Sequence, residues 1–352
     1  MKMKKNVALI SGGEGFEREI SKLSAANLFS LIDKSLYDVY NVHIDKDGCW
    51  FICPAPAEIY EENHDSEHIF TKTFPAFIDG VSGFLYEGGV IPIDCAIPCL
   101  HGDFGEDGCI QGTLTAAHIR YIGQDVYSSA ITSDKIYTKL AAEHLGIPIA
   151  KWIFTDGTAP LSNALKDAET KIGYPMFIKP ARLGSSYGAH PVRNKNEFKS
   201  AYEDAVSYEK RLIIEELIEF DYELECAFID VGKQFIIPGG RIRSNGAFYD
   251  FNAKYSKNSS AKTEAKTSGF SETENKITEY TRLLASLIGI RQLSRFDFFV
   301  TKSGEIFFNE INSFPGMTET SLFPRLSGCV GEKKGDFINL LIDGICSNDR
   351  RI

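Results

Sequence analysis

The sequence predicts an α/β protein in which a doubly wound parallel sheet is followed by two smaller α+β modules. In residues 1–124, short apolar runs of strand length alternate with segments whose apolar residues recur at helical spacing. Residues 125–217 repeat strand–helix alternation around a glycine- and serine-rich turn, and residues 218–352 contain two adjacent strand-like segments and a later hairpin. We therefore expect three units with these bounds.

The first unit shows the clearest alternation. Strands are expected at 6–11, 37–44 and 94–100, and helices at 17–33 and 109–119, with a less regular region between 45 and about 90. Two cysteine pairs, Cys49/Cys53 and Cys95/Cys99, have spacings compatible with metal ligation. Because the second pair lies in the apolar run DCAIPCL, buried free thiols are the favoured interpretation.

The central unit is predicted to start with one helix over 128–146. Strands at 150–155, 175–180 and 211–217 and helices at 161–172 and 196–208 follow, with the turn ARLGSSYGAH at 181–190.

The last unit is predicted to contain strands at 221–230 and 233–243, a helix at 275–289, a hairpin of 294–300 with 306–312, and a terminal helix at 336–347. The polar stretch 256–272 is almost without large apolar residues, and we expect a mobile loop that acts as a lid over an active site.

Composition narrows the class of function. The chain has 352 residues, 43% of them hydrophobic, and a formal net charge of −10, which argues against nucleic acid as the main partner. No apolar run approaches the roughly 18 residues of a membrane span, and the apolar part of the basic opening MKMKKNVALISGG is too short for a signal peptide. We expect a cytoplasmic protein without a membrane or nucleic-acid partner.

Polar residues inside the predicted hairpin point to a metal site. Glu310 and Asn312 are two residues apart in the apolar strand IFFNEIN, so they share a face, and Asp297 lies in the adjacent strand SRFDFFV. Carboxylate and amide oxygens suit Mg²⁺. Arg295 would point the same way, and without metal we expect it, lysines or water to compensate the carboxylates. The alternative is a solvated strand face or an internal salt bridge, but the aromatic neighbours disfavour a solvated strand.

Two further segments indicate ligand binding. Lys179 precedes the small-residue turn 181–190, whose backbone N–H groups suit phosphate oxygens, although the GK[ST] ending of a P-loop is missing. His101 ends the strand-like run at 94–100, where open α/β sheets bind ligands.

The first turn, SGGEGFERE, is ambiguous. Gly13 and Gly15 match part of a dinucleotide fingerprint, but Arg18 replaces its third glycine. Glu17 would repel a pyrophosphate at this strand–helix junction and suits an ammonium group better. A helix-starting acidic residue is the structural alternative.

Five segments together give the sequence a resemblance to the D-alanine–D-alanine ligase family of ATP-grasp enzymes: GGEGFEREIS, LHGDFGEDGCIQG, IKPARLGSSYG, FYDFNAKY and NEINSFPGMTETSL. They occur in the family's order and span nearly the whole chain. The resemblance implies that the second and third units are the two halves of an ATP-grasp fold that sandwich ATP. It also implies ligation of two D-alanine molecules through an acyl phosphate, in a homodimer joined through the first domain.

The resemblance also implies residue roles. The catalytic set is Glu17, Ser185, Tyr255, Arg295, Gly316 and Ser321. The substrate-binding set is His101, Lys254 and Leu322. The ATP-binding set is Lys135, Lys179, Ser185, Glu215, Glu216, Leu217, Glu223 and Lys254. The ligands of two Mg²⁺ or Mn²⁺ ions are Asp297, Glu310 and Asn312.

Alternatives remain within and outside the family. The Lys254–Tyr255 pair argues against a D-lactate-using ligase, and Leu322 favours D-alanine over D-serine as the second substrate. Thr320 stands where some relatives have histidine, and the polar 256–270 stretch stands where many have a more apolar one. Another ATP-grasp carboxylate–amine ligase and a non-catalytic nucleotide-binding regulator are the other two hypotheses.

Overall fold

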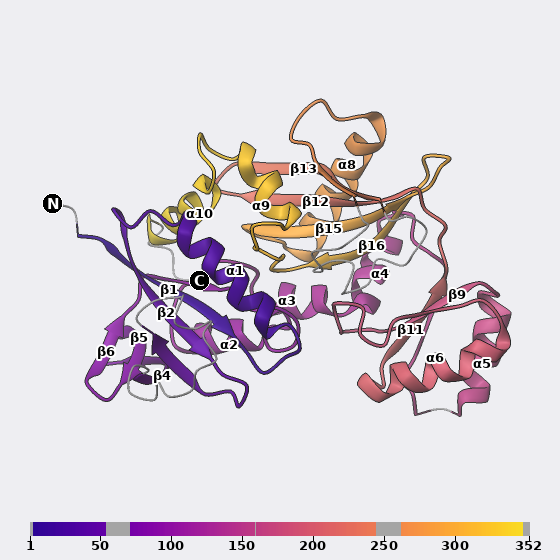
Figure 1. Cartoon of the computed structure of the whole chain (residues 1–352), viewed down its shortest axis with the longest axis horizontal. Coiled ribbons are helices and arrows are strands. Elements are labelled where there is room, and N and C mark those ends of the chain that lie inside the picture. The colour runs from indigo at the N-terminus through magenta and orange to yellow at the C-terminus, as the bar shows by residue number, and fades with distance from the viewer. Residues whose placement is uncertain (1–2, 54–70, 159, 244–261, 348–352) are drawn as a thin grey trace.

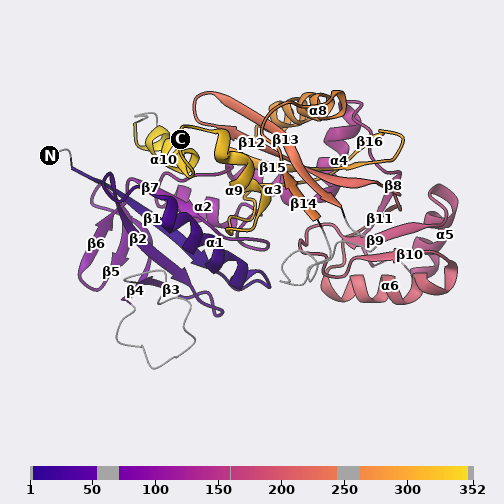
Figure 2. The ribbon, with the colours of Figure 1, turned by 45° about the horizontal axis from the view of Figure 1, so that its top comes forward.

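The computed structural model describes residues 3–53, 71–158, 160–243 and 262–347. These residues form three sheets of seven, four and five strands. In Figures 1 and 2 the N-terminal and central sheets lie at opposite ends of the molecule, and the C-terminal sheet lies between and above them.

The N-terminal sheet confirms the α/β prediction, but it is mixed. Strand β1 (Lys5–Gly12) pairs in parallel with β2 (Tyr37–Ile44) and β7 (Cys95–Pro98). Four antiparallel strands extend the sheet beyond β2: β3 (Trp50–Cys53), β4 (Thr71–Ile78), β5 (Val81–Tyr86) and β6 (Gly89–Pro92). They fall almost entirely between residue 45 and about residue 90, which the sequence predicts to be less regular. Short links such as the one between β4 and β5 allow only antiparallel pairing.

Helices α1 (Arg18–Leu31) and α2 (Cys109–Ala116) accompany this sheet. Cys95 and Cys99 are buried free thiols, as predicted, and burial raises the pKa of each.

The central sheet is antiparallel. Its order is β10–β9–β11–β8, with β8 at Trp152–Thr155, β9 at Met176–Pro180, β10 at His190–Val192 and β11 at Leu212–Glu216. Helices α5 (Leu161–Lys171) and α6 (Lys195–Tyr208) pack on one face through a core that includes Phe198. The predicted elements of this sheet are therefore confirmed.

The helix predicted over 128–146 is in fact two helices, α3 (Val126–Ser133) and α4 (Lys135–His144). The break is at Asp134, which has extended backbone and whose carboxylate accepts a hydrogen bond from the Ile136 N–H. Asp134 also pairs with Arg211 at 3.0 Å. A capping carboxylate therefore starts a second helix where the apolar pattern alone runs on.

The C-terminal sheet has the order β14–β13–β12–β15–β16, all antiparallel. The strands are β12 (Tyr222–Asp230), β13 (Gln234–Arg243), β14 (Lys262–Ala265), β15 (Leu293–Val300) and β16 (Ile306–Asn312). The loop prediction for 256–272 is wrong at 262–265, because β14 pairs with β13 there; residues 256–261 lie outside the described residues.

Helices cover this sheet and connect it to the rest. Helix α8 (Glu272–Ile288) starts at a capping box between Ser271 and Glu274. A short helix, α9 (Leu322–Leu326), a 3₁₀ turn at Ser327–Cys329 and α10 (Asp336–Ser347) complete the described chain.

Two shared cores join the units. One contains Leu9 and Leu28 of the N-terminal unit together with Leu293 and Phe337 of the C-terminal unit. The other joins Ala142 of α4 to the C-terminal sheet. The first core fixes the N-terminal and C-terminal units against each other, and the second fixes α4 of the central unit to the C-terminal sheet, so side chains from all three units can meet at one place. None of the described helices is both long enough and apolar enough to cross a lipid bilayer.

Candidate functional site

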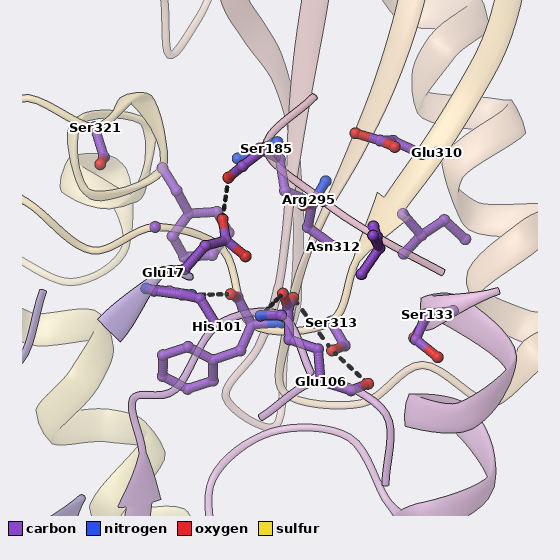
Figure 3. Close-up of a pocket in the computed structure, with 18 of the residues that line it drawn as sticks. Glu17, His101, Glu106, Ser133, Ser185, Arg295, Glu310, Asn312, Ser313 and Ser321 are labelled. Carbon is purple, nitrogen blue, oxygen red and sulfur yellow. Dashed lines mark hydrogen bonds between the residues drawn. The ribbon is translucent and has the colours of Figure 1, made fainter. Parts of the chain in front are cut away.

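Two adjoining cavities lie where the three units meet. The larger, of about 480 Å³, is lined by residues of all three units, and the smaller, of about 110 Å³, lies between the central and C-terminal sheets. Lys135, Ser185 and Glu310 line both. Figure 3 shows the larger cavity, with Glu17 and Ser185 facing each other and Arg295, Asn312 and Glu310 on the neighbouring strands.

The hairpin brings the predicted metal residues together. In the β15–β16 register, Asp297 is opposite Glu310 and Arg295 is opposite Asn312. Arg295 donates to both oxygens of Asp297, at 2.7 and 2.6 Å, and Asn312 Nδ2 donates to Asp297 Oδ2 at 3.1 Å. Lys135 Nζ lies 3.4 Å from Glu310 Oε2. The expectation that Arg295 and a lysine compensate these carboxylates is confirmed.

Glu225 joins this group and was missed by the sequence analysis. It lies on β12 opposite Asp297, and its Oε1 is 3.5 Å from Arg295 Nε. Burial would lower the pKa of Arg295, but the Asp297 and Glu225 carboxylates overcome this and raise it well above its ordinary value. The guanidinium therefore stays charged in a protein-lined site.

The donor set fits a divalent cation of the Mg²⁺ or Mn²⁺ type. Asp297 and Glu310 supply carboxylate oxygens and Asn312 an amide oxygen, all from one face of the hairpin. No group of three or more histidine, cysteine, aspartate or glutamate side chains with metal-site geometry occurs among the residues with described positions. The amide of Asn312 and oxygens of a ligand would therefore have to complete the coordination.

The smaller cavity has a buried charged cluster at its wall. Glu215 lies 2.6 Å from Lys179 Nζ and 2.8 Å from Lys139 Nζ. Burial alone would raise the pKa of Glu215, but the two ammonium groups overcome it and lower the pKa to about 2. Lys139 was not predicted; its position four residues after Lys135 on one helix face was the available signal.

The other predicted nucleotide residues that have described positions line the same cavity. They are Glu216, Leu217 and Glu223, together with Lys135, Lys179 and Ser185. Lys179 Nζ also donates to Asn309 Oδ1 at 3.2 Å. Because Glu215 contacts two lysines, its side chain holds the ammonium groups of Lys139 and Lys179 at the cavity wall.

Glu17 is held at the junction of two loops. The Ser185 hydroxyl donates a hydrogen bond to Glu17 Oε1. Ser185 and Ser186 have left-handed backbone, with φ of 51° and 64°, so the turn presents this hydroxyl at some conformational cost. Gly102 has φ of +67°, and a Cβ there would lie 2.7 Å from Glu17 Oε2. An alanine at 102 would therefore be strained at this φ and would displace the Glu17 carboxylate.

His101 links the units as a neutral ring. Its Nδ1 lies 3.2 Å from the Phe314 carbonyl oxygen, which can only accept, so Nδ1 carries the proton. Nε2 then accepts from the Ser24 hydroxyl at 3.2 Å, while Ser24 Oγ accepts from the Met317 N–H. Burial lowers the pKa of His101. The histidine lines the larger cavity, but its nitrogens position the turn that carries Gly316.

Glu106 is another residue that the sequence analysis missed. It accepts hydrogen bonds from the Gly102 N–H at 3.0 Å and the Phe314 N–H at 3.2 Å. Burial and the negative charge of Glu17 raise the pKa of Glu106 to about 7. The available signal was its place in the glycine-rich loop after the strand ending near His101.

The remaining predicted residues divide into two groups. Gly316, Ser321 and Leu322 line the larger cavity, and Ser321 Oγ is 2.7 Å from Thr318 Oγ1. Lys254 and Tyr255 lie outside the described residues. The described arrangement offers an anionic carboxylate for an ammonium group, a guanidinium, a metal-type oxygen set and lysines suited to phosphates.

Comparison with known proteins shows which proteins this chain is similar to. Residues 6–124 match the family model described as the D-ala D-ala ligase N-terminus, and residues 141–343 match the D-ala D-ala ligase C-terminus. A D-alanine–D-alanine ligase of Chloroherpeton thalassium is 34% identical over 97% of this chain and 96% of its own length.

Two solved structures have the same fold. VanG D-Ala:D-Ser ligase from Enterococcus faecalis has a TM-score of 0.87 at 30% identity, over 97% of this chain and all of that chain (100%). D-alanyl-alanine synthetase A from Vibrio cholerae has a TM-score of 0.84 at 30% identity, over 99% of this chain and 100% of its own.

Proposed function

The chain belongs to the D-alanine–D-alanine ligase family, and from this premise we propose that it joins two D-alanine molecules into D-alanyl-D-alanine for peptidoglycan precursor synthesis. The enzyme is an ATP-dependent ligase. In the proposed reaction, a carboxylate oxygen of the first D-alanine attacks the γ-phosphorus of ATP, and ADP leaves. The amine of the second D-alanine then attacks the acyl carbon, loses a proton and displaces inorganic phosphate.

The single observation that carries this proposal is that Lys135 and Glu310 line both cavities. A nucleotide in the smaller cavity would therefore present its terminal phosphate at the edge of the larger one. Lys135 and Lys179 supply positive charge along that path, because a phosphoryl group in transfer needs neutralisation and positioning rather than a protein nucleophile.

The amino-acid side of the reaction is assigned to the larger cavity. Glu17 would bind the ammonium group of the first D-alanine, held by Ser185, while the Gly102 backbone leaves it room. Arg295 would stabilise the negative charge on the acyl phosphate and the tetrahedral intermediate. Gly316 would offer its backbone to the reacting oxygen, and Ser321 and Leu322 would contact the second D-alanine.

Asp297, Glu310 and Asn312 would hold the divalent cations. When bound, Mg²⁺ or Mn²⁺ would neutralise the phosphate oxygens of ATP. Arg295 donates to both oxygens of Asp297 in this structure. When a cation binds Asp297, Arg295 would lose part of this contact and would keep its ion pair with Glu225.

The test of activity uses the purified chain with ATP, Mg²⁺ and D-alanine. We expect phosphate release coupled to D-alanyl-D-alanine, detected by mass spectrometry. Because a D-Ala:D-Ser ligase has the same fold, D-serine and D-lactate are offered in competition with D-alanine. If D-alanyl-D-serine is the preferred product, the protein is a D-alanine–D-serine ligase instead. If no product forms with any D-amino or hydroxy acid, the proposal is refuted.

The metal assignment is tested separately from turnover. Titration with Mn²⁺ in the presence of a non-hydrolysable ATP analogue, followed by electron paramagnetic resonance, should show weaker binding in Glu310→Gln. Glu305→Gln is the matched control, because Glu305 lies exposed at the turn of the same hairpin and accepts from Ser303. Equal Mn²⁺ affinity in the Glu310 variant and the wild type would remove Glu310 from the ligand set.

We also propose the three domains 1–124, 125–217 and 218–352 and a homodimer in the cytoplasm. Exposed apolar side chains on β4 and β5, among them Phe74 and Phe77, support a dimer through the first domain. Light scattering during gel filtration should give twice the chain mass of 39.2 kDa. A mass of one chain at micromolar concentration would refute the dimer.

A further inference from the structure

Two aromatic rings from different units stack beside the Glu17–Ser185 contact. Phe16, in the loop before α1, and Tyr187, in the central turn, have ring centroids 4.8 Å apart and an interplanar angle of 29°. Tyr208 at the end of α6 stands 6.2 Å from Tyr187, so the turn side of the stack is backed by a second ring.

Phe16 is not a core residue. Its side chain is 65% exposed, so the hydrophobic gain from burying it is small. An aromatic ring that is left largely in water but placed face to face with a second ring gains mainly from that pairing. The stack therefore forms only when the loop before α1 and the central turn are close together, and it stabilises that arrangement of the two loops.

The distance between these two loops also determines where the Glu17 carboxylate lies relative to Ser185. Phe16 precedes Glu17 in sequence, and Tyr187 follows Ser185 by two residues, so the ring pair and the hydrogen bond span the same gap. On the turn side, a Cβ at Gly184 would lie 3.4 Å from Glu17 Oε2, an ordinary contact distance. The Glu17 carboxylate therefore lies next to a turn that belongs to another sheet.

We propose that Phe16 and Tyr187 form an aromatic latch that holds the Glu17 loop against the Ser185 turn and thereby sets the affinity for the ammonium group of the first amino acid. This inference rests on the proposed ligase function. Phe16 acts as a positioning residue, because it reaches the first amino acid only through Glu17. Tyr187 acts on the first amino acid through Ser185 and also lines the smaller cavity.

The latch predicts a specific kinetic pattern. Loss of one exposed aromatic pair should shift the equilibrium between joined and separated loops by about two- to tenfold. In Phe16→Ala, the KM for D-alanine at the first site, taken from a two-site rate law, should rise by up to that factor. At saturating D-alanine the loops are joined by the substrate itself, so kcat should be retained, and the KM for ATP should not change.

A double-mutant cycle separates a latch from independent surface effects. Tyr187→Ala should raise the KM for the first D-alanine as much as Phe16→Ala, and the double variant should be no worse in that KM than either, because the first substitution already removes the pair. The KM for ATP is compared in Phe16→Ala alone, because Tyr187 lines the smaller cavity. Tyr187→Phe keeps the ring and should restore wild-type kinetics. Phe154→Ala is the matched control, since Phe154 is 59% exposed on β8 of the same central unit. Additive effects, or an unchanged KM in Phe16→Ala, would refute the latch.

Hydrogen exchange gives a readout that does not depend on turnover. In Phe16→Ala, amides of residues 183–189 should exchange faster, although the substitution lies in another unit of the fold. Unchanged exchange in that segment would refute the latch even if the chain makes no dipeptide. If the wild type makes dipeptide and the variants have the same KM and the same hydrogen exchange as the wild type, the latch is refuted while the ligase function is retained.

Discussion

Glu215→Gln is the most informative perturbation of the smaller cavity. The substitution keeps the size and one acceptor oxygen of the side chain but removes its charge. Lys139 and Lys179, both buried, would then share a neutral amide in place of a carboxylate at 2.8 and 2.6 Å. Two buried ammonium groups without a counter-charge are costly.

The size of the effect follows from the pKa. The folded protein lowers the pKa of Glu215 from 4.5 to about 2, and each unit corresponds to about 1.4 kcal/mol. The charge of Glu215 therefore contributes about 3 kcal/mol to the free energy of unfolding near neutral pH. This agrees with the roughly 3–5 kcal/mol expected when one partner of a buried ion pair is removed.

The sign of the pH dependence is fixed by the same shift. Because the folded pKa lies below the unfolded one, the contribution of Glu215 is complete above pH 4.5 and declines as the pH falls toward about 2. The difference in unfolding free energy between wild type and Glu215→Gln should thus be constant from pH 5 to 8 and smaller at pH 3.5.

Urea unfolding followed by tryptophan fluorescence is the assay. The chain has two tryptophans, and Trp152 lies opposite Glu215 in the central sheet, so a Trp50→Phe background isolates the local signal. Glu216→Gln, the next residue on β11 and only half-buried, is the control and should change stability by no more than about 0.5 kcal/mol. Equal midpoints and slopes for Glu215→Gln and wild type at pH 7 would refute the reasoning.

Three further predictions concern the larger cavity. Gly102→Ala should raise the KM for D-alanine at least about tenfold by displacing Glu17. Gly146→Ala is the control and should leave this KM unchanged, because Gly146 has a φ of +65° but no atom within 4 Å of an added Cβ. Similar KM values in the two variants would count against the steric argument. Asp297→Asn should abolish turnover and weaken Mn²⁺ binding, measured as above, and full activity would exclude it as a ligand. The pKa of Glu106 is raised to about 7, so its contribution to the free energy of unfolding should fall as pH rises from 4.5 to 7, and the difference in unfolding free energy between wild type and Glu106→Gln, measured in urea, should fall over that range.

The convergence of polar side chains on the β15–β16 hairpin could be predicted because its geometry is local. Side chains alternate along a strand, and a short turn sets the partner strand, so the spacing of Glu310 and Asn312 and the position of Asp297 determine one shared face. Glu225 was missed because β12 and β15 are separated by more than 60 residues of sequence, and no local pattern gives their register.

Other errors have equally specific causes. The stretch over β14 was predicted as loop because its residues are polar, but β14 is the edge strand of its sheet and most of it faces solvent, so no apolar pattern is needed. The helix break at Asp134 was missed because apolar periodicity continues through it, while the cap and the Arg211 ion pair depend on tertiary structure. Glu106 acts through backbone N–H groups of two loops, which sequence spacing does not bring together.

In the proposed function, the distribution of partners would allow one cavity to bind both cations and anions. The carboxylates of Asp297 and Glu310 contact Arg295 and Lys135, and these pairs would exchange partners with divalent cations and phosphates. Glu17 is different, because its described hydrogen bond comes from the neutral hydroxyl of Ser185, and its charge raises the pKa of Glu106 nearby. A negative charge that is oriented, and that forms no ion pair with the described part of the chain, attracts an ammonium group. A hydroxy acid lacks that group, so D-lactate should fail as the first substrate even if it were accepted as the second.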